Sequence, residues 1–345
     1  MTVTVRPDSE TELAAALHDT AGPVRLLGGG SRQQRLPDPG AATRIELAGL
    51  DRIERLDAGD QTCTVGPGVR REELDAALAP HELCLPCAGT GTIGGLFASD
   101  PIGAVTTGGP QPRSLLLGID AVLRDGTEFR SGARVTKSVA GFDLHKLFVG
   151  SQGRLFAVTR LHLRLKPRPR VSRWFATAAT TPAEALALLQ RLRGEAVPPA
   201  ALHLVRDRNG ARVVGRVDGR AGIVERTFAA HGLADAAPFE RLQLEPPADG
   251  EVLAGSLRPS QTVQLLDLAP PDAEFVLHGG GRFELALGGA TETDALLTRL
   301  PELPAHACIV RGRPDRRGRG TALDPGQSRL AATLTRALDP DGTLV

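Results

Sequence analysis

The stretch that decides the fold is residues 85–110, LPCAGTGTIGGLFASDPIGAVTTGGP, together with residues 136–167, TKSVAGFDLHKLFVGSQGRLFAVTRLHLRLKP. Glycines stand at positions 89, 91, 94, 95, 103, 108, 109 and 118. Glycine lets the main chain adopt positive φ and approach a ligand without a Cβ in the way. A single glycine of this kind is better explained by a tight turn. The cluster as a whole predicts a site for a large flat or anionic cofactor.

The residues around this stretch predict strands and one further glycine turn. Residues 118–124 and 155–165 are typical of strands, with a short helical segment between them that Asp143 is placed to cap. Upstream, Ser9 and Glu12 form a capping box, which predicts a short helix. A buried strand at 24–27 then runs into GGGSRQ, residues 28–33, a turn whose N–H groups can hold an anion. The turn fits neither G-x-G-x-x-G nor a Walker A motif, which excludes those two nucleotide-binding classes.

Three motifs carry a resemblance to a known family. They are TIGG at 92–95, KSVAGFDL at 137–144 and VGSQG at 149–153. In this order and at this spacing they resemble the FAD-binding domain of the PCMH type, also called the vanillyl-alcohol-oxidase type. Within that family the chain is similar to the GlcE-type subunit of bacterial glycolate oxidase.

The resemblance implies a set of cofactor-binding residues. The pyrophosphate of FAD is expected between the 28–33 turn and the 92–95 motif, with the flavin ring near residues 86 and 140–141 and the adenine near residue 158. No histidine stands between Ser31 and Arg35, so the FAD is expected to be non-covalent. The expected positions are Gly28, Gly29, Gly30, Ser31, Arg32, Gln33, Pro86, Gly91, Thr92, Gly94, Gly95, Gly103, Ala140, Gly141 and Val158.

Several positions depart from the family's pattern. The family commonly has Asn at Ser138, Glu at Gln152 and Gly at Phe156. Phe156 matters most, because a bulky ring beside the adenosine would narrow that pocket. The chain also ends soon after Asp339-Pro340-Asp341-Gly342, where the family usually continues.

The length of 345 residues predicts two domains. Prolines 167 and 169 mark the expected boundary, because they interrupt a helix and disfavour a central strand. Beyond it, strands and helices alternate without an evident internal repeat, as in a ferredoxin-like layer. The expected fold class is α+β, with a two-subdomain PCMH-type FAD-binding domain at 1–168 followed by a smaller α/β cap-like domain at 169–345.

Composition excludes several partners. Lys+Arg of 41 against Asp+Glu of 40 gives a net charge of +1, which provides no broad attraction to nucleic acid or anionic lipid. Aromatic residues make up 3% and tyrosine is absent, so base-stacking platforms and a tyrosine acid or base are not expected. No signal peptide or membrane span is predicted. The expected location is cytoplasmic, peripheral to the inner membrane through a complex.

Catalytic groups are harder to find in the sequence, and no catalytic residue is assigned. Cys84 and Cys87 form a C-x-x-C, but four thiolates or four zinc ligands are lacking around it, so no metal or redox role is expected. The eight histidines show no metal-ligand spacing, and no metal is expected. Arg282 follows three glycines and either contacts a carboxylate or lies in a surface turn. The basic run 311–319 is interpreted as a solvated loop, with a docking patch as the alternative.

The resemblance therefore implies an FAD-dependent oxidoreductase, the FAD-binding subunit of a glycolate oxidase complex that acts on a 2-hydroxy acid. Its partners would be a catalytic flavin subunit and an iron–sulfur subunit. Two alternatives stay open: a self-sufficient FAD-dependent oxidoreductase, and a scaffold subunit of the same complex that has lost FAD.

Overall fold

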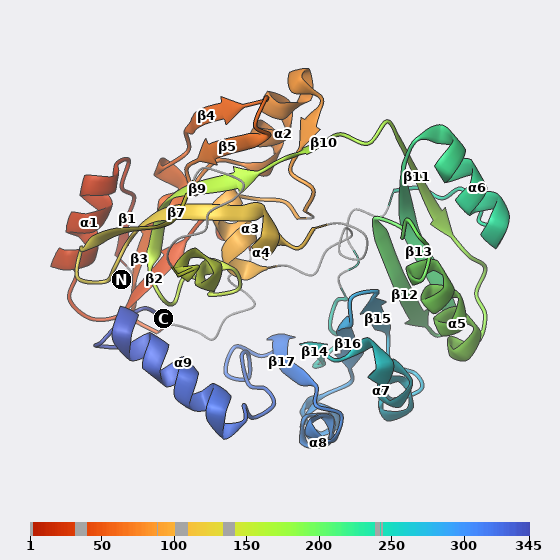
Figure 1. The fold of residues 1–345 in the computed structure, drawn as a ribbon. Coiled ribbons are helices and arrows are strands. Elements are labelled where there is room, and N and C mark those ends of the chain that lie inside the picture. Colours follow the sequence, from red (N-terminus) through yellow and green to blue (C-terminus); the bar gives the residue numbers. More distant parts are fainter. Residues whose placement is uncertain are drawn as a thin grey trace.

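The computed structural model describes residues 3–31, 40–87, 89–100, 110–133, 142–238, 242 and 244–345. Helices and several separate sheets mix throughout these residues, which confirms the expected α+β class (Figure 1). Three sheets are built from strands before residue 168, and one seven-stranded sheet from strands after it. We keep 1–168 and 169–345 as a proposed domain division.

The N-terminal region is organised around a five-stranded antiparallel sheet in the order β4-β5-β9-β7-β8. Its strands are β4 (Ile53–Asp57), β5 (Thr62–Val65), β7 (Leu116–Val122), β8 (Glu128–Gly132) and β9 (Ala157–Arg164). A parallel sheet in the order β1-β3-β2 lies beside it, with β1 (Thr4–Val5), β2 (Val24–Leu27) and β3 (Thr43–Glu46). A short pair joins β6 (Leu83–Cys84) to β10 (Lys166–Pro167).

The helices of this region are short, and their ends test the sequence-based expectations. They are α1 (Glu10–Asp19), α2 (Arg71–Leu78), α3 (Ile93–Ser99) and α4 (Pro112–Leu115). The Ser9 side chain accepts the N–H of Glu12 at 3.2 Å, which confirms the predicted cap of α1. The predicted cap by Asp143 was wrong. Residues Leu144–Phe148 form a 3₁₀ helix, η4, whose Lys146 N–H bonds the Asp143 backbone oxygen instead of the side chain.

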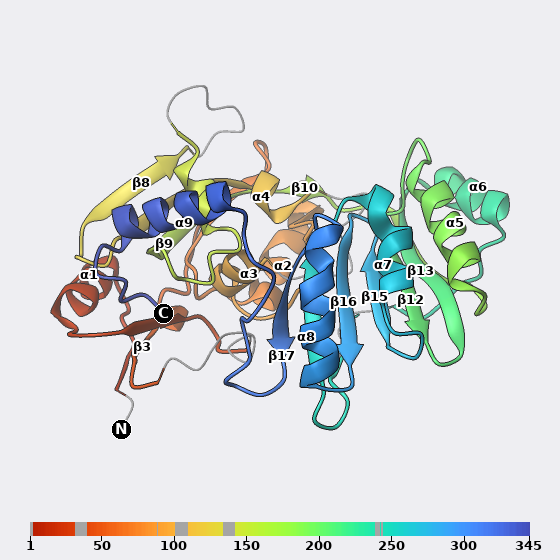
Figure 2. The same cartoon turned by 90° about the horizontal axis from the view of Figure 1, so that it is seen from below.

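The C-terminal region is a seven-stranded antiparallel sheet in the order β11-β13-β12-β15-β16-β14-β17. Its strands are β11 (Val171–Ala176), β12 (Ala201–Asp207), β13 (Gly210–Gly219), β14 (Glu251–Ser256), β15 (Phe275–His278), β16 (Arg282–Leu287) and β17 (His306–Arg311). Helices α5 (Pro182–Arg193), α6 (Ala221–His231), α7 (Thr262–Leu268) and α8 (Ala290–Arg299) lie over one face (Figure 2).

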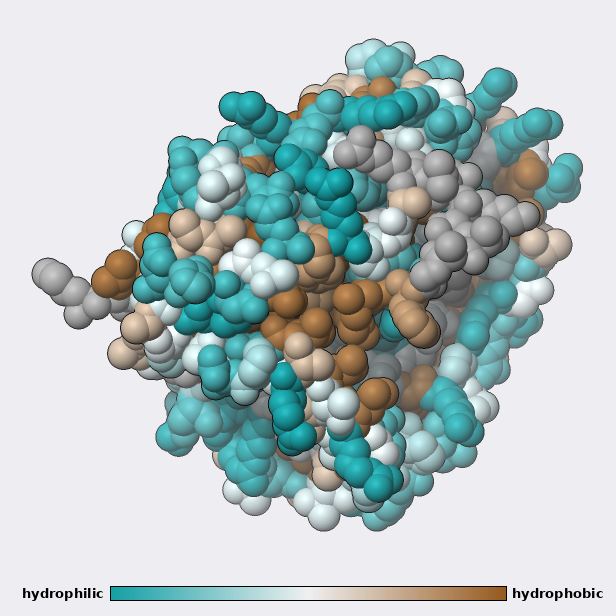
Figure 3. All heavy atoms as spheres, turned by 60° about the vertical axis from the view of Figure 1, so that its left-hand side comes forward, coloured by the Kyte–Doolittle hydropathy of each residue, from teal (hydrophilic) through white to brown (hydrophobic). Residues whose placement is uncertain are grey.

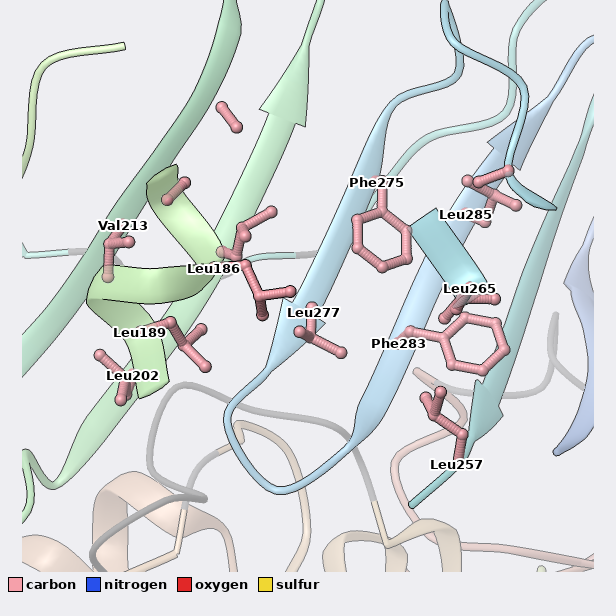
Figure 4. Packing of buried hydrophobic residues seen from close by; sticks show 14 of the residues in the cluster. Leu186, Leu189, Leu202, Val213, Leu257, Leu265, Phe275, Leu277, Phe283 and Leu285 are labelled. Carbon is pink, nitrogen blue, oxygen red and sulfur yellow. The ribbon is translucent and has the colours of Figure 1, made fainter. Parts of the chain in front are cut away.

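Alternation along the strands decides which residues this sheet buries under its helices. Leu186 and Leu189 of α5 pack on Leu202 and Val213, as Figure 4 shows, and Leu265 of α7 packs over the next strands. The opposite face carries the other set of alternating residues, among them Val252, Ala254, Val276 and Ala286, which form a smaller buried cluster with residues 244 and 310. Among the residues that the structure describes, no helix covers this second face, which is available to line a site.

The C-terminal sheet contains a repeat that the sequence does not reveal. Elements β14, α7, β15, β16, α8 and β17 follow the β-α-β-β-α-β order, and their strands lie in the order 17-14-16-15. This is the ferredoxin-like arrangement. Elements β11, α5, β12, β13 and α6 repeat the first five of these six, with strands in the equivalent order 11-13-12. The two units share one sheet through the β12–β15 pair.

The last helix, α9 (Pro325–Leu338), returns the chain to the N-terminal region (Figure 1). After it, Asp339 is buried and accepts the N–H of Leu344 at 2.8 Å. Leu344 pairs with Val24 of β2, and Val24 donates to the Thr343 oxygen at 2.7 Å. Residues 343–345 therefore pair in parallel with β2 of the N-terminal sheet.

Figure 3 shows the side of the molecule on which α1 lies in Figure 1, where apolar residues gather near the centre among hydrophilic ones. Exposed large apolar side chains include Phe142, at 97%, and Leu330, at 62%. Within the described residues, no helix combines the length and the apolar character needed to cross a membrane.

Candidate functional site

A cavity of about 610 Å³ lies between the N-terminal region and the helix-free face of the C-terminal sheet. This volume is in the range of cofactor and small-molecule sites, about 300–1,000 Å³. The N-terminal wall is formed mainly by residues around the glycine motifs, namely Leu26–Ser31, Leu47, Pro67, Thr92, Gly94, Gly95, Ala98–Asp100, Phe148, Gly150, Gln152, Gly153, Phe156 and Val158. The C-terminal wall is formed by Ala254–Ser256, Arg282, His306–Cys308, Val310, Gly318, Gly320, Thr321 and Leu323.

Two glycines are required for the N-terminal wall to form. A Cβ on Gly28 would lie 2.2 Å from Oγ1 of Thr92, so the 28–31 turn and the 92–95 motif are in contact only because this residue has no side chain. A Cβ on Gly94 would lie 2.6 Å from Cβ and 2.9 Å from the backbone oxygen of Pro67. These close approaches bring two motifs, 64 positions apart, to one wall.

The third motif is held against the end of α3. Gly150 donates its N–H to the Phe97 oxygen at 3.1 Å, and Gln152 donates to the Ala98 oxygen at 2.8 Å. Carbonyls at a helix C-terminus have no partner within the helix, so this loop satisfies two of them. Gln152, where the family commonly has Glu, has a positive φ of 57° and contributes to the cavity wall.

Phe156 is packed into the protein beside the cavity. Its ring is 1% exposed, meets Phe129 edge-on at 5.2 Å and stacks with Phe148 at 6.2 Å. It lines the wall together with Val158, the residue expected near adenine. The ring that the family lacks is therefore accommodated by aromatic packing, and the cavity remains.

The C-terminal wall contributes polar side chains. Ser256, Arg282 and His306 lie directly opposite one another on β14, β16 and β17, and all three line the cavity. Arg282 donates to the backbone oxygen of Asp100 at 3.1 Å and pairs with the Asp100 carboxylate. The alternative of a free surface turn for Arg282 is thus replaced by a contact with a carboxylate of the chain itself.

The predicted cofactor residues fall into three groups. Gly28, Gly29, Gly30, Ser31, Thr92, Gly94, Gly95 and Val158 come together on the N-terminal wall. Pro86 and Gly91 lie outside the lining, although the Gly91 oxygen accepts from Arg71 at the start of α2. Arg32, Gln33, Gly103, Ala140 and Gly141 lie outside the described residues. The cofactor roles of all these positions stay predictions.

Sequence reasoning missed several lining residues. Asp100 caps the C-terminus of α3, five positions after the TIGG motif, so its spacing from that motif was a usable signal. His306 and Cys308 had no such signal, because only strand pairing places β17 beside β14 at the cavity.

Cys87 and the arginines of the basic run 311–319 have structural explanations in burial and ion pairing. Burial raises the pKa of Cys87 to about 11, and Arg71 bonds the Cys87 and Leu85 oxygens, so the thiol stays protonated at neutral pH. In the described part of the chain, no group of three or more His, Cys, Asp or Glu side chains is arranged to hold a metal ion. Within the basic run, Arg316 pairs with Glu251 and Asp294, and Arg313 with Asp315.

Two histidines that are 75 positions apart meet inside the C-terminal sheet. Nδ1 of His278 lies 2.8 Å from Nδ1 of His203, and both side chains are fully buried. Burial, followed by the neighbouring His203 and Arg282, holds the pKa of His278 well below its usual value. His278 is therefore expected to stay uncharged at neutral pH.

Comparison with known proteins identifies the glycine-rich wall. Residues 1–132 match the family model described as FAD binding domain. This region is an FAD-binding domain. The resemblance expected from the three motifs is confirmed, and so is FAD as the cofactor. The glycine contacts and the cavity volume agree with a site for a group of that size.

Several relatives match part of this chain. The D-lactate dehydrogenase of Archaeoglobus fulgidus is 31% identical over 179 residues, covering 49% of this chain and 39% of the relative. The glycolate oxidase subunit GlcE of Escherichia coli is 32% identical over 125 residues, 35% of this chain and 36% of the relative. The subunit GlcD of Bacillus subtilis is 32% identical over 128 residues, covering 36% of this chain and 27% of the relative. The matches span less than half the length of each of these relatives.

A solved structure shares the fold over nearly the whole chain. Alkyldihydroxyacetonephosphate synthase superposes with a TM-score of 0.70 at 13% identity, covering 99% of this chain and 76% of the other. The FAD-binding domain and the C-terminal sheet thus occur together in a known fold.

Proposed function

We propose that this chain is the FAD-binding subunit of a glycolate-oxidase-type complex, an FAD-dependent oxidoreductase that oxidises a small 2-hydroxy acid. The observation that carries the proposal is the cavity. It joins a wall of glycine motifs in the FAD-binding domain to a wall with Arg282, Ser256 and His306.

The two walls have complementary chemistry. Glycine backbone at residues 28–31 and 94–95 suits a large anionic cofactor, because main-chain N–H groups can approach its phosphates. A guanidinium and two polar side chains suit a small acid, because Arg binds a carboxylate through two parallel hydrogen bonds. Bound FAD supplies a hydride acceptor and can pass electrons on. The chain's own residues bind the cofactor, orient the acid and restrict water.

The names of the GlcD and GlcE relatives, both glycolate oxidase subunits, support a complex of several subunits. The partners that we propose in it are a catalytic flavin subunit and an iron–sulfur subunit. Under this proposal the complex works in the cytoplasm, peripheral to the inner membrane. Non-covalent attachment of FAD is part of the proposal.

The test is the visible spectrum of the purified chain, followed by anaerobic mixing with glycolate or D-lactate. A flavin spectrum, with FAD released by heat, is expected. Flavin reduction that requires added GlcD-type and iron–sulfur subunits supports the subunit role. A chain that stays colourless after incubation with FAD would contradict the proposal and leave the FAD-free scaffold.

A self-sufficient FAD-dependent oxidoreductase is the second candidate. It is favoured by the polar C-terminal wall, since a chain that only supports a partner has no need of Arg282 and His306 in its cavity. Bleaching of the flavin by a hydroxy acid without any partner would select this candidate.

A further inference from the structure

Arg282 belongs to a row of polar residues that crosses five neighbouring strands. In the sheet, His203 pairs with His278, His278 with Arg282, Arg282 with Ser256, and Ser256 with His306. Residues directly opposite in antiparallel strands project from the same face. We call these five residues the polar row. It lies on the face without helices, and its Arg282–Ser256–His306 end opens into the cavity.

The backbone that carries Arg282 is fixed by hydrogen bonds. Within the β15–β16 turn, Gly279 donates to Leu202, Gly281 donates to His278, and the Gly281 oxygen accepts from Leu257, each at 2.8 Å. Gly281 has a φ of 88°, and a Cβ there would lie 2.4 Å from the Leu257 oxygen. Figure 4 shows this turn beyond Leu277 and Phe283, directed toward the FAD-binding domain. The guanidinium is therefore presented from a rigid support.

The partner of Arg282 comes from the other wall. Asp100 follows α3, has a φ of 39° and donates its N–H to the Phe97 oxygen. Its carboxylate pairs with the guanidinium, and the two side chains remain 19% and 31% exposed, respectively. A partly exposed ion pair contributes little net stability, because water and salt screen it. Exchanging Asp100 for another carboxylate leaves Arg282 with an equivalent partner.

We propose that Arg282, flanked by Ser256 and His306, is the seat for the carboxylate of a small acid, and that Asp100 is an internal competitor which the acid displaces. The proposal rests on the proposed function and names the group by which the substrate is held. It makes Asp100 a specificity-determining residue, because a ligand without a carboxylate cannot take its place on Arg282.

The proposal predicts that loss of Asp100 increases the affinity for an acid, which a merely structural ion pair would not do. Removing the Asp100 carboxylate frees Arg282, so an added acid binds more tightly. Asp100 is part of the same chain, so it competes with the acid at an effective concentration in the millimolar range or above. Removing this competitor should tighten the binding of the acid about ten-fold. Removing the guanidinium abolishes binding in either background.

The experiment is a calorimetric titration of the full chain, with and without FAD, using oxalate as the probe. Oxalate has two carboxylates and no alcohol to oxidise, so its binding is read without turnover. The variants are Asp100→Asn, Arg282→Met, Arg282→Lys and the Asp100→Asn/Arg282→Met double variant. Asn also tolerates positive φ, so Asp100→Asn preserves the backbone at this position.

We expect Asp100→Asn to bind oxalate about ten-fold more tightly than the unchanged chain. Arg282→Met and the double variant should not bind it, and Arg282→Lys should bind it weakly because the forked donor is lost. The matched controls, Asp272→Asn and Arg258→Met, alter residues outside the cavity and should leave binding unchanged. Ethylene glycol should not compete with oxalate.

Unchanged or weaker oxalate binding by a folded Asp100→Asn variant overturns the inference and makes the ion pair a structural link between the two walls. Circular dichroism establishes that the variant is folded. The proposed function fails on a different result, namely the absence of flavin reduction by hydroxy acids. Either result is obtained without the other.

Discussion

The two walls of the cavity are built on different physical principles. The FAD-binding wall consists of contiguous motifs. Its close backbone packing requires residues without a side chain, such as Gly28 and Gly94. The opposite wall consists of side chains from separate strands, Ser256, Arg282 and His306, brought together by pairing alone. A short sequence motif can therefore specify the first wall. The second depends on the register of the whole sheet.

The largest expected effect is a loss of stability at Phe156, the position where the FAD-binding wall does depend on a side chain. Replacing Phe156 by Ala should lower the free energy of unfolding by about 3–5 kcal/mol, because it empties a fully buried aromatic site. It should not tighten FAD binding. Denaturant unfolding and FAD titration measure the two quantities, and Phe142→Ala, at an exposed ring, is the control. Tighter FAD binding by Phe156→Ala would mean that the ring obstructs the cofactor.

The next largest expected effect is a loss of stability when a buried ion pair beside the opposite wall is broken. Arg316 anchors the segment that brings Gly318 and Gly320 to the cavity, by pairing with Glu251, a side chain 2% exposed. Arg316→Leu should cost about 3 kcal/mol of unfolding free energy, since the Glu251 carboxylate would stay buried without this partner. Arg313→Leu is the matched control, because its pair with Asp315 is largely exposed and is worth about 0–1 kcal/mol. Equal losses in the two variants would contradict the assignment.

A smaller effect tests the backbone contact in the FAD-binding wall. Gly28→Ala should weaken FAD binding by about ten-fold, because overpacking costs about 1–3 kcal/mol where the new Cβ meets Thr92. Adding Thr92→Ala removes the contacted Oγ1 and should restore part of the affinity. Gly29→Ala is the control, since its Cβ would lie 3.5 Å from the nearest atom, an ordinary contact. If Gly29→Ala and Gly28→Ala weaken FAD binding equally, the close approach is not the cause.

The smallest effect concerns pH and the buried histidines of the polar row. The pKa of His278 is depressed in the folded chain, so below about pH 6.5 the unfolded chain binds a proton that the folded chain does not. The contribution of His278 to stability is present above that pH and is lost as the pH falls, by at most about 1.4 kcal/mol per pH unit. Thermal unfolding between pH 7.5 and 5.0 measures this loss.

The double variant His203→Leu/His278→Leu removes the pair and should lose less stability on acidification than the unchanged chain. The control is His81→Gln, at an exposed position. An identical pH dependence in the double variant would show that other groups control acid sensitivity.

The sequence by itself determined the FAD-binding domain. The 28–31 turn, the TIGG motif and the VGSQG loop each lie within a few consecutive residues and line one wall of the cavity, because glycine acts locally on the backbone. It also predicted the α+β class and the helix cap at Ser9. The cap at Asp143 failed because a backbone oxygen took the expected role of the side chain.

Tertiary structure alone decided the rest of the site. His203 meets His278 across 75 positions, and Arg282 meets Asp100 across 182 positions. His306 lies opposite Ser256, which is 50 positions earlier in the chain. Strand register and domain packing bring these residues together. The ferredoxin-like repeat likewise emerges only from strand order. Local sequence determines backbone turns, because their energetics involve neighbouring residues. Contacts between distant side chains depend on the packing of the whole chain, which no short motif encodes.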